Sequence, residues 1–249
     1  MEQTEIKLTF LGSGDAFGSG GRLQPCVHIS RGQLCFLIDC GSSALISMKR
    51  HEIDPSNVEA VLVSHLHGDH FSGIPFMLRE TQILSRRTSP LVIAGPPGLE
   101  DCIRTCMRIF FPGSWNQDLS FDLHFLEMEA SRHYTFGDMS ATLFPAVHTP
   151  ATNPHSIRVQ MGSKSIAYTG DTEWNSNLIE ACRTTELSIC ECFKFEGPLK
   201  NHLDYKTLRM NHQLLETHRI VLTHMSDDML KRIHEIEFEC SYDGMSLTI

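Results

Sequence analysis

Three histidines and one aspartate lie within six residues of this chain, in the stretch VSHLHGDHFSG at residues 63–73. Imidazole nitrogens and carboxylate oxygens are the side-chain ligands that zinc and related metals use most. A single buried histidine is more often a core residue than a ligand, but three histidines around an aspartate fit poorly with packing alone. The sequence therefore predicts a metal site, with ligands from His65, His67, Asp69 and His70.

The segments around this motif place it at the end of a strand. Residues 58–65 form an apolar, β-rich run, and residues 72–84 have the apolar spacing of a helix. Side chains alternate along extended backbone, so His65 and His67 can point to the same side, and Gly68 permits a sharp turn before the next ligands. Four ligands this close crowd one tetrahedral ion, so the spacing favours two adjacent ions.

Three other expected strands end in a residue type that binds metals. His148 follows ATLFPAV, Asp171 ends SIAYTGD, and His224 ends RIVLTH. Loops that follow strands at one edge of a sheet often build active sites. We therefore expect these three side chains to complete the metal site.

Strand-like and helix-like segments interleave along the rest of the chain. The expected strands are residues 6–11, 34–40, 58–65, 91–95, 123–128, 141–147, 156–161, 165–171, 187–193, 219–224 and 245–249. The expected helices are residues 43–53, 72–84, 99–111, 175–185, 205–218 and 228–236. Interleaving of this kind predicts a fold with layers of helices and layers of strands. No linker or low-complexity tract divides the sequence, so we expect one domain over residues 1–249.

Composition narrows the functional classes. No apolar run approaches the roughly 18 residues that span a bilayer, and the N-terminal MEQTEIKLTFLG lacks the basic and apolar regions of a secretion signal, so we expect a cytoplasmic protein with no membrane partner. Nine scattered cysteines without a CxxC pair argue against a disulfide framework or a cysteine zinc finger. A net charge of −9 disfavours a large polyanionic partner.

The glycine-rich segment LGSGDAFGSGG at residues 11–21 is a separate candidate. It does not give GxGxxG leading into a helix, and no GK[ST] follows, so a nucleotide-cofactor loop is disfavoured. We expect instead a flexible turn that crosses the mouth of the site.

The motifs HLHGDH, FPAVHT, YTGDT and VLTHMS, in that order, resemble the metallo-β-lactamase-fold hydrolase superfamily, particularly its ribonuclease Z-like and phosphodiesterase branch. LTFLGSGDA, FLIDCG and HGDHFSGIP extend the resemblance over nearly the whole chain. The resemblance implies an α/β (α+β) fold, a four-layer αββα sandwich with its site at one edge of the packed sheets. Family habit also suggests a homodimer.

The resemblance further implies how two divalent metal ions are held. The ligands form two sets and a bridge: His65, His67 and His148 for the first ion, Asp69, His70 and His224 for the second, and Asp171 between them with a water or hydroxide. Zinc is the first choice because imidazole and carboxylate ligands suit it, and manganese and iron stay open.

Two residues are candidates for catalysis. His202, in KNHLDYKTL, lies 22 residues before His224 and looks like the histidine that ribonuclease Z-like enzymes carry as proton donor to the leaving alkoxide. The alternative is an exposed histidine that caps the helix starting near Asp204. Asp69 is the second candidate, because its relatives suggest that it orients the bridging water or accepts its proton.

Two further residues are expected near the ligands. Asp39, at the end of CFLIDC, is expected to accept a hydrogen bond from a ligand histidine rather than to bind metal. His155 shares a loop with His148, and whether it lines the substrate pocket stays open at this point.

The substrate is the least specified feature. Ribonuclease Z commonly carries a long insertion that grips tRNA between the residues matching His148 and Asp171, whereas only 22 residues separate them here. Together with the acidic charge, this argues against tRNA and favours a small-molecule phosphodiester, cyclic or linear, cleaved through the metal-bridging hydroxide. The alternatives are a lactonase or thioesterase acting on carboxylic esters, a mononuclear iron oxygenase, and a non-catalytic metal-binding module.

Overall fold

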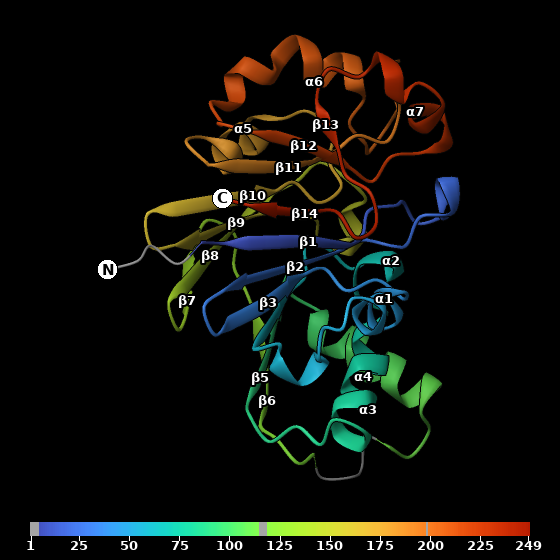
Figure 1. Cartoon of the computed structure of the whole chain (residues 1–249), viewed down its shortest axis with the longest axis vertical. Coiled ribbons are helices and arrows are strands. Elements are labelled where there is room, and N and C mark those ends of the chain that lie inside the picture. Colours follow the sequence, from blue (N-terminus) through green and yellow to red (C-terminus); the bar gives the residue numbers. More distant parts are fainter. Residues whose placement is uncertain (1–4, 115–118, 198) are drawn as a thin grey trace.

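Two facing β-sheets form the centre of the computed structural model, which describes residues 5–114, 119–197 and 199–249 (Figure 1). In the first sheet, β14, β1, β2 and β3 pair antiparallel, and β3, β4, β5 and β6 pair parallel. Its strands, in spatial order, are β14 (Ser246–Thr248), β1 (Lys7–Gly12), β2 (Cys26–Arg31), β3 (Leu34–Ile38), β4 (Ala60–Leu62), β5 (Leu91–Gly95) and β6 (Leu123–Glu127).

The second sheet repeats this division into two halves. Its strands β10 to β13 pair parallel, and β7 to β10 pair antiparallel. In spatial order they are β13 (Glu239–Cys240), β12 (Ile220–Thr223), β11 (Leu187–Glu191), β10 (Lys164–Tyr168), β9 (His155–Met161), β8 (Met139–Pro145) and β7 (His133–Phe136).

Helices cover the outer face of each sheet. The first sheet is covered by α1 (Ala44–Arg50), α3 (Ile74–Ile83) and α4 (Leu99–Phe110), and the second by α5 (Ser176–Cys182), α6 (Tyr205–Asn211) and α7 (Asp227–Lys231) (Figure 1). The one-turn helix α2 (Gly68–Phe71) lies before α3. This order of layers confirms the predicted four-layer αββα sandwich.

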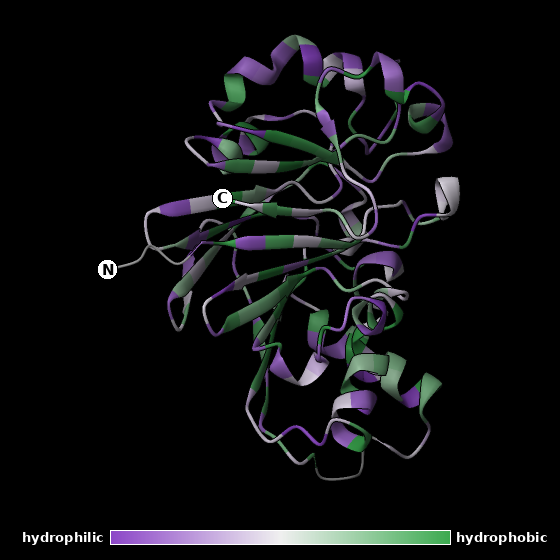
Figure 2. Ribbon diagram, in the orientation of Figure 1, coloured by the Kyte–Doolittle hydropathy of each residue, from purple (hydrophilic) through white to green (hydrophobic). Residues whose placement is uncertain are grey.

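Three apolar clusters hold the layers together. The largest lies between the sheets, where Phe36 and Ile38 of one sheet meet Ile157 and Ile189 of the other. The other two lie under the helices of each face. Strands that are covered on both faces must be apolar on both faces, and hydrophobic colour accordingly dominates the strands while the helices are mixed (Figure 2).

Most expected elements are present with ends that differ by a few residues. Three short strands were not expected: β2, β7 and β13. Polar residues interrupt these segments, and their hydrogen bonds to neighbouring strands stabilise them instead. The expected helix 205–218 ends as α6 at Asn211 and continues as a 3-10 turn, His212–Leu215, before left-handed Glu216.

The expected sharp turn at Gly68 is wrong. Gly68 is the first residue of α2, and a Cβ there would meet no atom within 4 Å. A helical turn brings Asp69 and His70 to the site without needing left-handed backbone, so the position does not require glycine for conformation or space.

The prediction that the N-terminus lacks a secretion signal rests partly on residues 1–4, which lie outside the described residues. Across the described part of the chain, no helix has the length and apolar character needed to cross a membrane.

Candidate metal centre

The predicted ligands meet at one edge of the two sheets. Parallel strands end at the same edge, and β4, β10 and β12 end just before His65, Asp171 and His224. Strand β8 runs antiparallel to β9, which runs antiparallel to β10, so its end also brings His148 to this edge. The first sheet and the second sheet therefore each contribute ligands.

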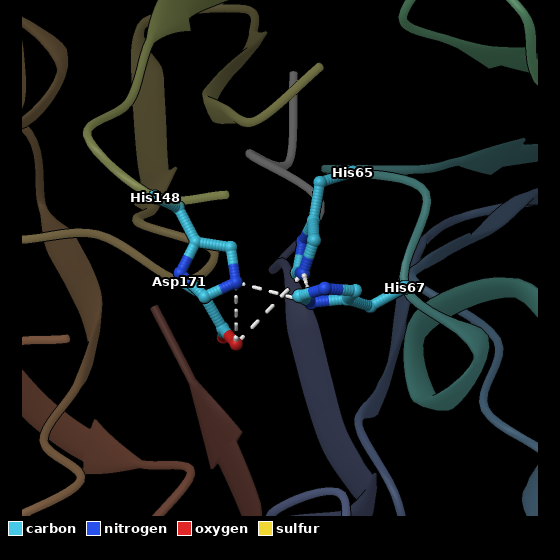
Figure 3. A group of neighbouring side chains, drawn as sticks. All are labelled: His65, His67, His148 and Asp171. Carbon is cyan, nitrogen blue, oxygen red and sulfur yellow. Dashed lines mark hydrogen bonds and ion pairs between the residues drawn. The ribbon is translucent and has the colours of Figure 1, made fainter. Parts of the chain in front are cut away.

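The first group of ligand atoms joins three imidazole rings and a carboxylate. His67 Nδ1 lies 3.1 Å from His65 Nε2 and 3.0 Å from His148 Nε2, and Asp171 Oδ2 lies 3.8 Å from the Nε2 atoms of both His65 and His148. Figure 3 shows the ring nitrogens turned toward one another and toward the carboxylate. Bonds of 2.0–2.1 Å to a tetrahedral zinc place its ligand atoms roughly 3.3 Å apart, which matches this spacing closely.

The second group lies on the other side of Asp171. Asp69 Oδ2 is 3.2 Å from His70 Nε2 and 3.5 Å from His224 Nε2. Asp171 Oδ1 is 3.5 Å from the Nε2 atoms of both histidines. The two oxygens of Asp171 thus face different groups, and the structure brings together all the residues that the sequence predicted as ligands.

Unpaired polar atoms indicate what these groups could hold. Among the described residues, His70 Nε2, Asp171 Oδ1 and His224 Nδ1 are buried without a hydrogen-bond partner. Buried polar atoms are almost always paired, because leaving one unpaired costs about 1–3 kcal/mol. Of these atoms, His70 Nε2 and Asp171 Oδ1 lie 3.5 Å apart in the second group, whereas His224 faces that group with Nε2 and not with the unpaired Nδ1. Unpaired atoms that converge in a buried site are the arrangement that a cation satisfies, so the donor set fits divalent metal ions.

Burial and charge shift the pKa values of the ligand residues. Burial lowers the pKa of His65 well below its usual range, which favours the neutral imidazole that binds metals. Burial also opposes charge on His70, but the carboxylates of Asp69 and Asp171 outweigh it and raise its pKa well above the usual range. Burial tends to raise the pKa of Asp171, yet His224 and His70 hold it well below its usual range, so Asp171 is ionised.

Asp39 and Ser64 fix the orientation of two of the histidines. His70 Nδ1 lies 2.6 Å from Asp39 Oδ2 and donates to it, as the sequence predicted for Asp39. Ser64 donates its backbone N–H to Asp39 Oδ1 at 2.8 Å and its hydroxyl to Asp39 Oδ2 at 2.9 Å, and the same hydroxyl oxygen lies 3.1 Å from His65 Nδ1. Each ring is therefore held at the nitrogen that faces away from the cluster.

His202 lies beside the ligands rather than on the surface. Its side chain is 20% exposed, its ring stacks on Phe193 with centroids 4.7 Å apart, and its Nδ1 is 3.9 Å from Asp171 Oδ2. This placement disagrees with the alternative of an exposed capping histidine. The cap of α6 is Asp204, whose carboxylate accepts the backbone N–H of Thr207 at 3.0 Å.

Glu191 is a site residue that the sequence reasoning missed. It is the last residue of β11, it is 1% exposed, and its Oε2 lies 3.1 Å from His202 Nδ1. Burial, then the charge of Asp171, raises the pKa of Glu191 well above its usual range. The sequence did contain an indication of this residue. Glu191 is a glutamate within the apolar run LSICECF, and like several candidate ligands it lies at the end of a strand.

Two other candidates have structural contacts. His155 is the first residue of β9, and its Nδ1 donates to the carbonyl of Asn153 at 2.8 Å, outside both ligand groups. The glycine-rich loop is held in place rather than free: Asp15 Oδ1 accepts the backbone N–H groups of Phe17 and Ser19, at 3.1 and 3.0 Å. This loop lies against the site, because the Ser13 carbonyl accepts the backbone N–H of His224 at 3.1 Å.

Residues 6–240 match the protein family described as Anti-Pycsar protein Apyc1. The chain belongs to this family. It is also 31% identical over 131 residues to the ribonuclease Z of Picrophilus torridus, an alignment covering 53% of this chain and 40% of that protein. The chain spans half or less of the length of these curated relatives, which are described as ribonuclease Z.

Solved structures agree with the fold. The metallo-β-lactamase-fold protein YhfI of Bacillus subtilis superposes with a TM-score of 0.79 at 20% identity, over 98% of this chain and 100% of that one. The short form of human tRNase Z superposes with a TM-score of 0.78 at 22% identity, over 97% and 98% of the two chains. The predicted metallo-β-lactamase fold is confirmed, and the alignments with ribonuclease Z support the predicted resemblance to ribonuclease Z-like proteins.

Proposed function

We propose that this protein is a dinuclear metal-dependent hydrolase that cleaves a small phosphodiester, cyclic or linear. The observation that carries the proposal is the position of Asp171, which presents one carboxylate oxygen to each of two groups of ligand atoms. His65, His67 and His148 would hold one ion, and Asp69, His70 and His224 the other. Zinc remains the first choice, because one solved structure with this fold is described as Zn2+-bound.

Two bound divalent ions would lower the pKa of a water molecule and polarise the phosphoryl oxygens of the substrate. The protein's own residues would protonate the leaving oxygen and orient the attacking water. His202 would protonate the oxygen that leaves, since its Nδ1 engages Glu191 and its Nε2 is left for the substrate. Asp69, which contacts both His70 and His224, would help to orient the attacking water.

The size of the substrate is inferred from the segment between two ligands. Residues 149–170 form a 3-10 turn, Pro150–Thr152, followed by β9 and β10. These elements belong to the sandwich itself, so this segment supplies no arm for a tRNA. The acidic net charge of −9 also favours a small substrate whose charge the two ions can neutralise.

An RNA nuclease is the second candidate, because the curated relatives are described as ribonuclease Z. The test is metal quantification on the purified protein, coupled to four substrates: bis(p-nitrophenyl) phosphate, a precursor tRNA, a lactone and a thioester. The proposal expects two ions per chain and hydrolysis of the diester alone. Cleavage of the tRNA would favour the nuclease, whereas activity only on the lactone or thioester, or one iron per chain without hydrolysis, would refute the proposal.

His202 gives the first prediction. His202→Ala should lower turnover of a dialkyl phosphate about 100-fold, because an alkoxide needs a proton to leave, and should affect a p-nitrophenyl ester much less. Metal content should stay at the wild-type value. His155→Ala is the matched control, because this histidine lies outside both ligand groups. Loss of metal in His202→Ala would show that His202 is a ligand and that the proposed role is wrong.

A further inference from the structure

A cavity of about 650 Å³ opens beside the metal centre. Its lining includes His202 together with Trp174, Lys200, Thr207 and Met210. His202 lines this cavity and also lies beside the ligand group, with its Nδ1 3.9 Å from Asp171 Oδ2. A group bonded to the oxygen that His202 would protonate could therefore extend into the cavity. The cavity is therefore placed to hold the departing half of a substrate.

The wall between the cavity and the metal centre is fixed by hydrogen bonds. Glu173, which also lines the cavity, accepts the backbone N–H of Asn201 at 2.7 Å. The carbonyl of the same Asn201 accepts from Nδ1 of the ligand His148 at 2.5 Å. The distance between the cavity and the ligands is thus set by the structure before a substrate arrives, which favours recognition by shape.

Most polar groups of the lining already have partners. The Asp204 carboxylate accepts from the Thr207 hydroxyl at 2.6 Å, and the Lys206 ammonium pairs with Glu196. Lys200 is exposed and forms no ion pair within the described residues. The groups left for a ligand are the half-buried indole of Trp174, the Met210 side chain and the Lys200 ammonium.

We infer that this cavity selects the leaving half of the phosphodiester and that it prefers an alcohol carrying a planar aromatic group, which packs on Trp174. Lys200 interacts with an acceptor or an anionic substituent at the edge of that group. The flat, apolar face of an indole favours an aromatic ring over an aliphatic one of the same size, and stacking of this kind contributes beyond buried area. The inference rests on the proposed phosphodiesterase activity.

Two substrates test the aromatic preference. Methyl 2-phenylethyl phosphate and methyl 2-cyclohexylethyl phosphate have similar size and similar leaving-group basicity, and differ in ring planarity. The wild-type protein should release phenylethanol in preference to methanol, and its kcat/KM should be about 3- to 10-fold higher for the aromatic diester. Trp174→Leu should abolish this difference while Trp174→Phe keeps most of it. Phe110→Leu, on the exposed side of α4, is the matched control.

A third substrate tests Lys200. A para-carboxylate on the phenyl ring should raise kcat/KM for the wild-type protein. Lys200→Met should remove this gain, so that this variant shows the same kcat/KM for the carboxylated and the uncharged diester. Lys231→Met, on α7, serves as the charge-matched control.

The outcomes separate the two proposals. If bis(p-nitrophenyl) phosphate is hydrolysed but the aromatic and cyclohexyl diesters react equally, or methanol is the alcohol released, the cavity does not select the leaving half and the inference is overturned. If no phosphodiester is hydrolysed, the proposed function fails and the inference fails with it. Metal content and thermal unfolding of each variant should match the wild type, which excludes misfolding as the cause of a lost preference.

Discussion

Asp171 is the residue on which the proposed centre depends most. Its carboxylate lies within 3.5–3.8 Å of four imidazole nitrogens, and its oxygens divide between the two ligand groups. A carboxamide has one acceptor oxygen and one NH2 donor, so an asparagine cannot serve both groups.

Asp171→Asn should therefore bind fewer than two ions per chain and lose at least about 100-fold in phosphodiester hydrolysis. Metal analysis and steady-state kinetics on the same preparation would measure both. Asp138→Asn, an exposed aspartate in the turn before β8, is the matched control. Full metal content in Asp171→Asn would contradict a bridging role for Asp171.

At the scale of elements, the C-terminal segment positions the glycine-rich loop against the site. Asp243, just before β14, accepts the backbone N–H of Ser13 at 2.9 Å and that of Leu23 at 2.8 Å, so one carboxylate holds both ends of residues 13–23. The carbonyl of Ser13 in turn accepts the backbone N–H of His224. The chain end thus supports a ligand of the second group.

Asp243→Asn should weaken this support, since the amide can accept at only one of the two positions. Hydrogen bonds to a charged group contribute about 1.5–3 kcal/mol, so the free energy of unfolding should fall by roughly that amount. Metal bound by the Asp69, His70 and His224 group should be lost at lower chelator concentration. Asp227→Asn is the control, because Asp227 accepts from Gly20 in the same loop at 3.0 Å but does not contact Ser13. Equal effects of both variants would show that the whole loop, not Ser13, controls His224.

At the scale of the whole molecule, the proposed metal centre joins the two sheets. His65, His67, Asp69 and His70 follow β4 of the first sheet, whereas His148, Asp171 and His224 follow strands of the second. Metal ions at this edge would bind the folded chain and not the unfolded one, which stabilises the fold by mass action.

Removing the metals with a chelator should therefore lower the thermal midpoint. Stabilisation of about 4 kcal/mol applies when free metal is 1,000-fold above its Kd, and each kcal/mol shifts the midpoint of a chain of this size by about 2–4 °C. Differential scanning fluorimetry with and without chelator measures the shift, which should be about 10 °C. Asp171→Asn should show a much smaller shift, and an equal one would refute stabilisation through the bridged centre.

The sequence by itself determined the types of the candidate ligands and the edge of the fold where they lie. Apolar runs that stop at a histidine or aspartate, together with the HLHGDH motif, pointed to the seven candidate ligands that the structure brings together. Interleaved helices and strands indicated the layers. Both depend on local patterns that a linear sequence carries. Asp39 also lies at the end of an apolar run, CFLIDC, and the sequence therefore allowed it to be placed beside a candidate ligand histidine.

The tertiary structure alone decided how these residues divide and what surrounds them. Which oxygen of Asp171 faces which histidines, the contact of Glu191 with His202, and the cavity lined by Trp174 all join segments distant in the chain. Such contacts depend on how the two sheets pack, and no local pattern of residue types encodes that geometry. Glu191 appeared in the sequence as one polar residue in a strand, and only its burial next to Asp171 and His202 gives it a chemical role.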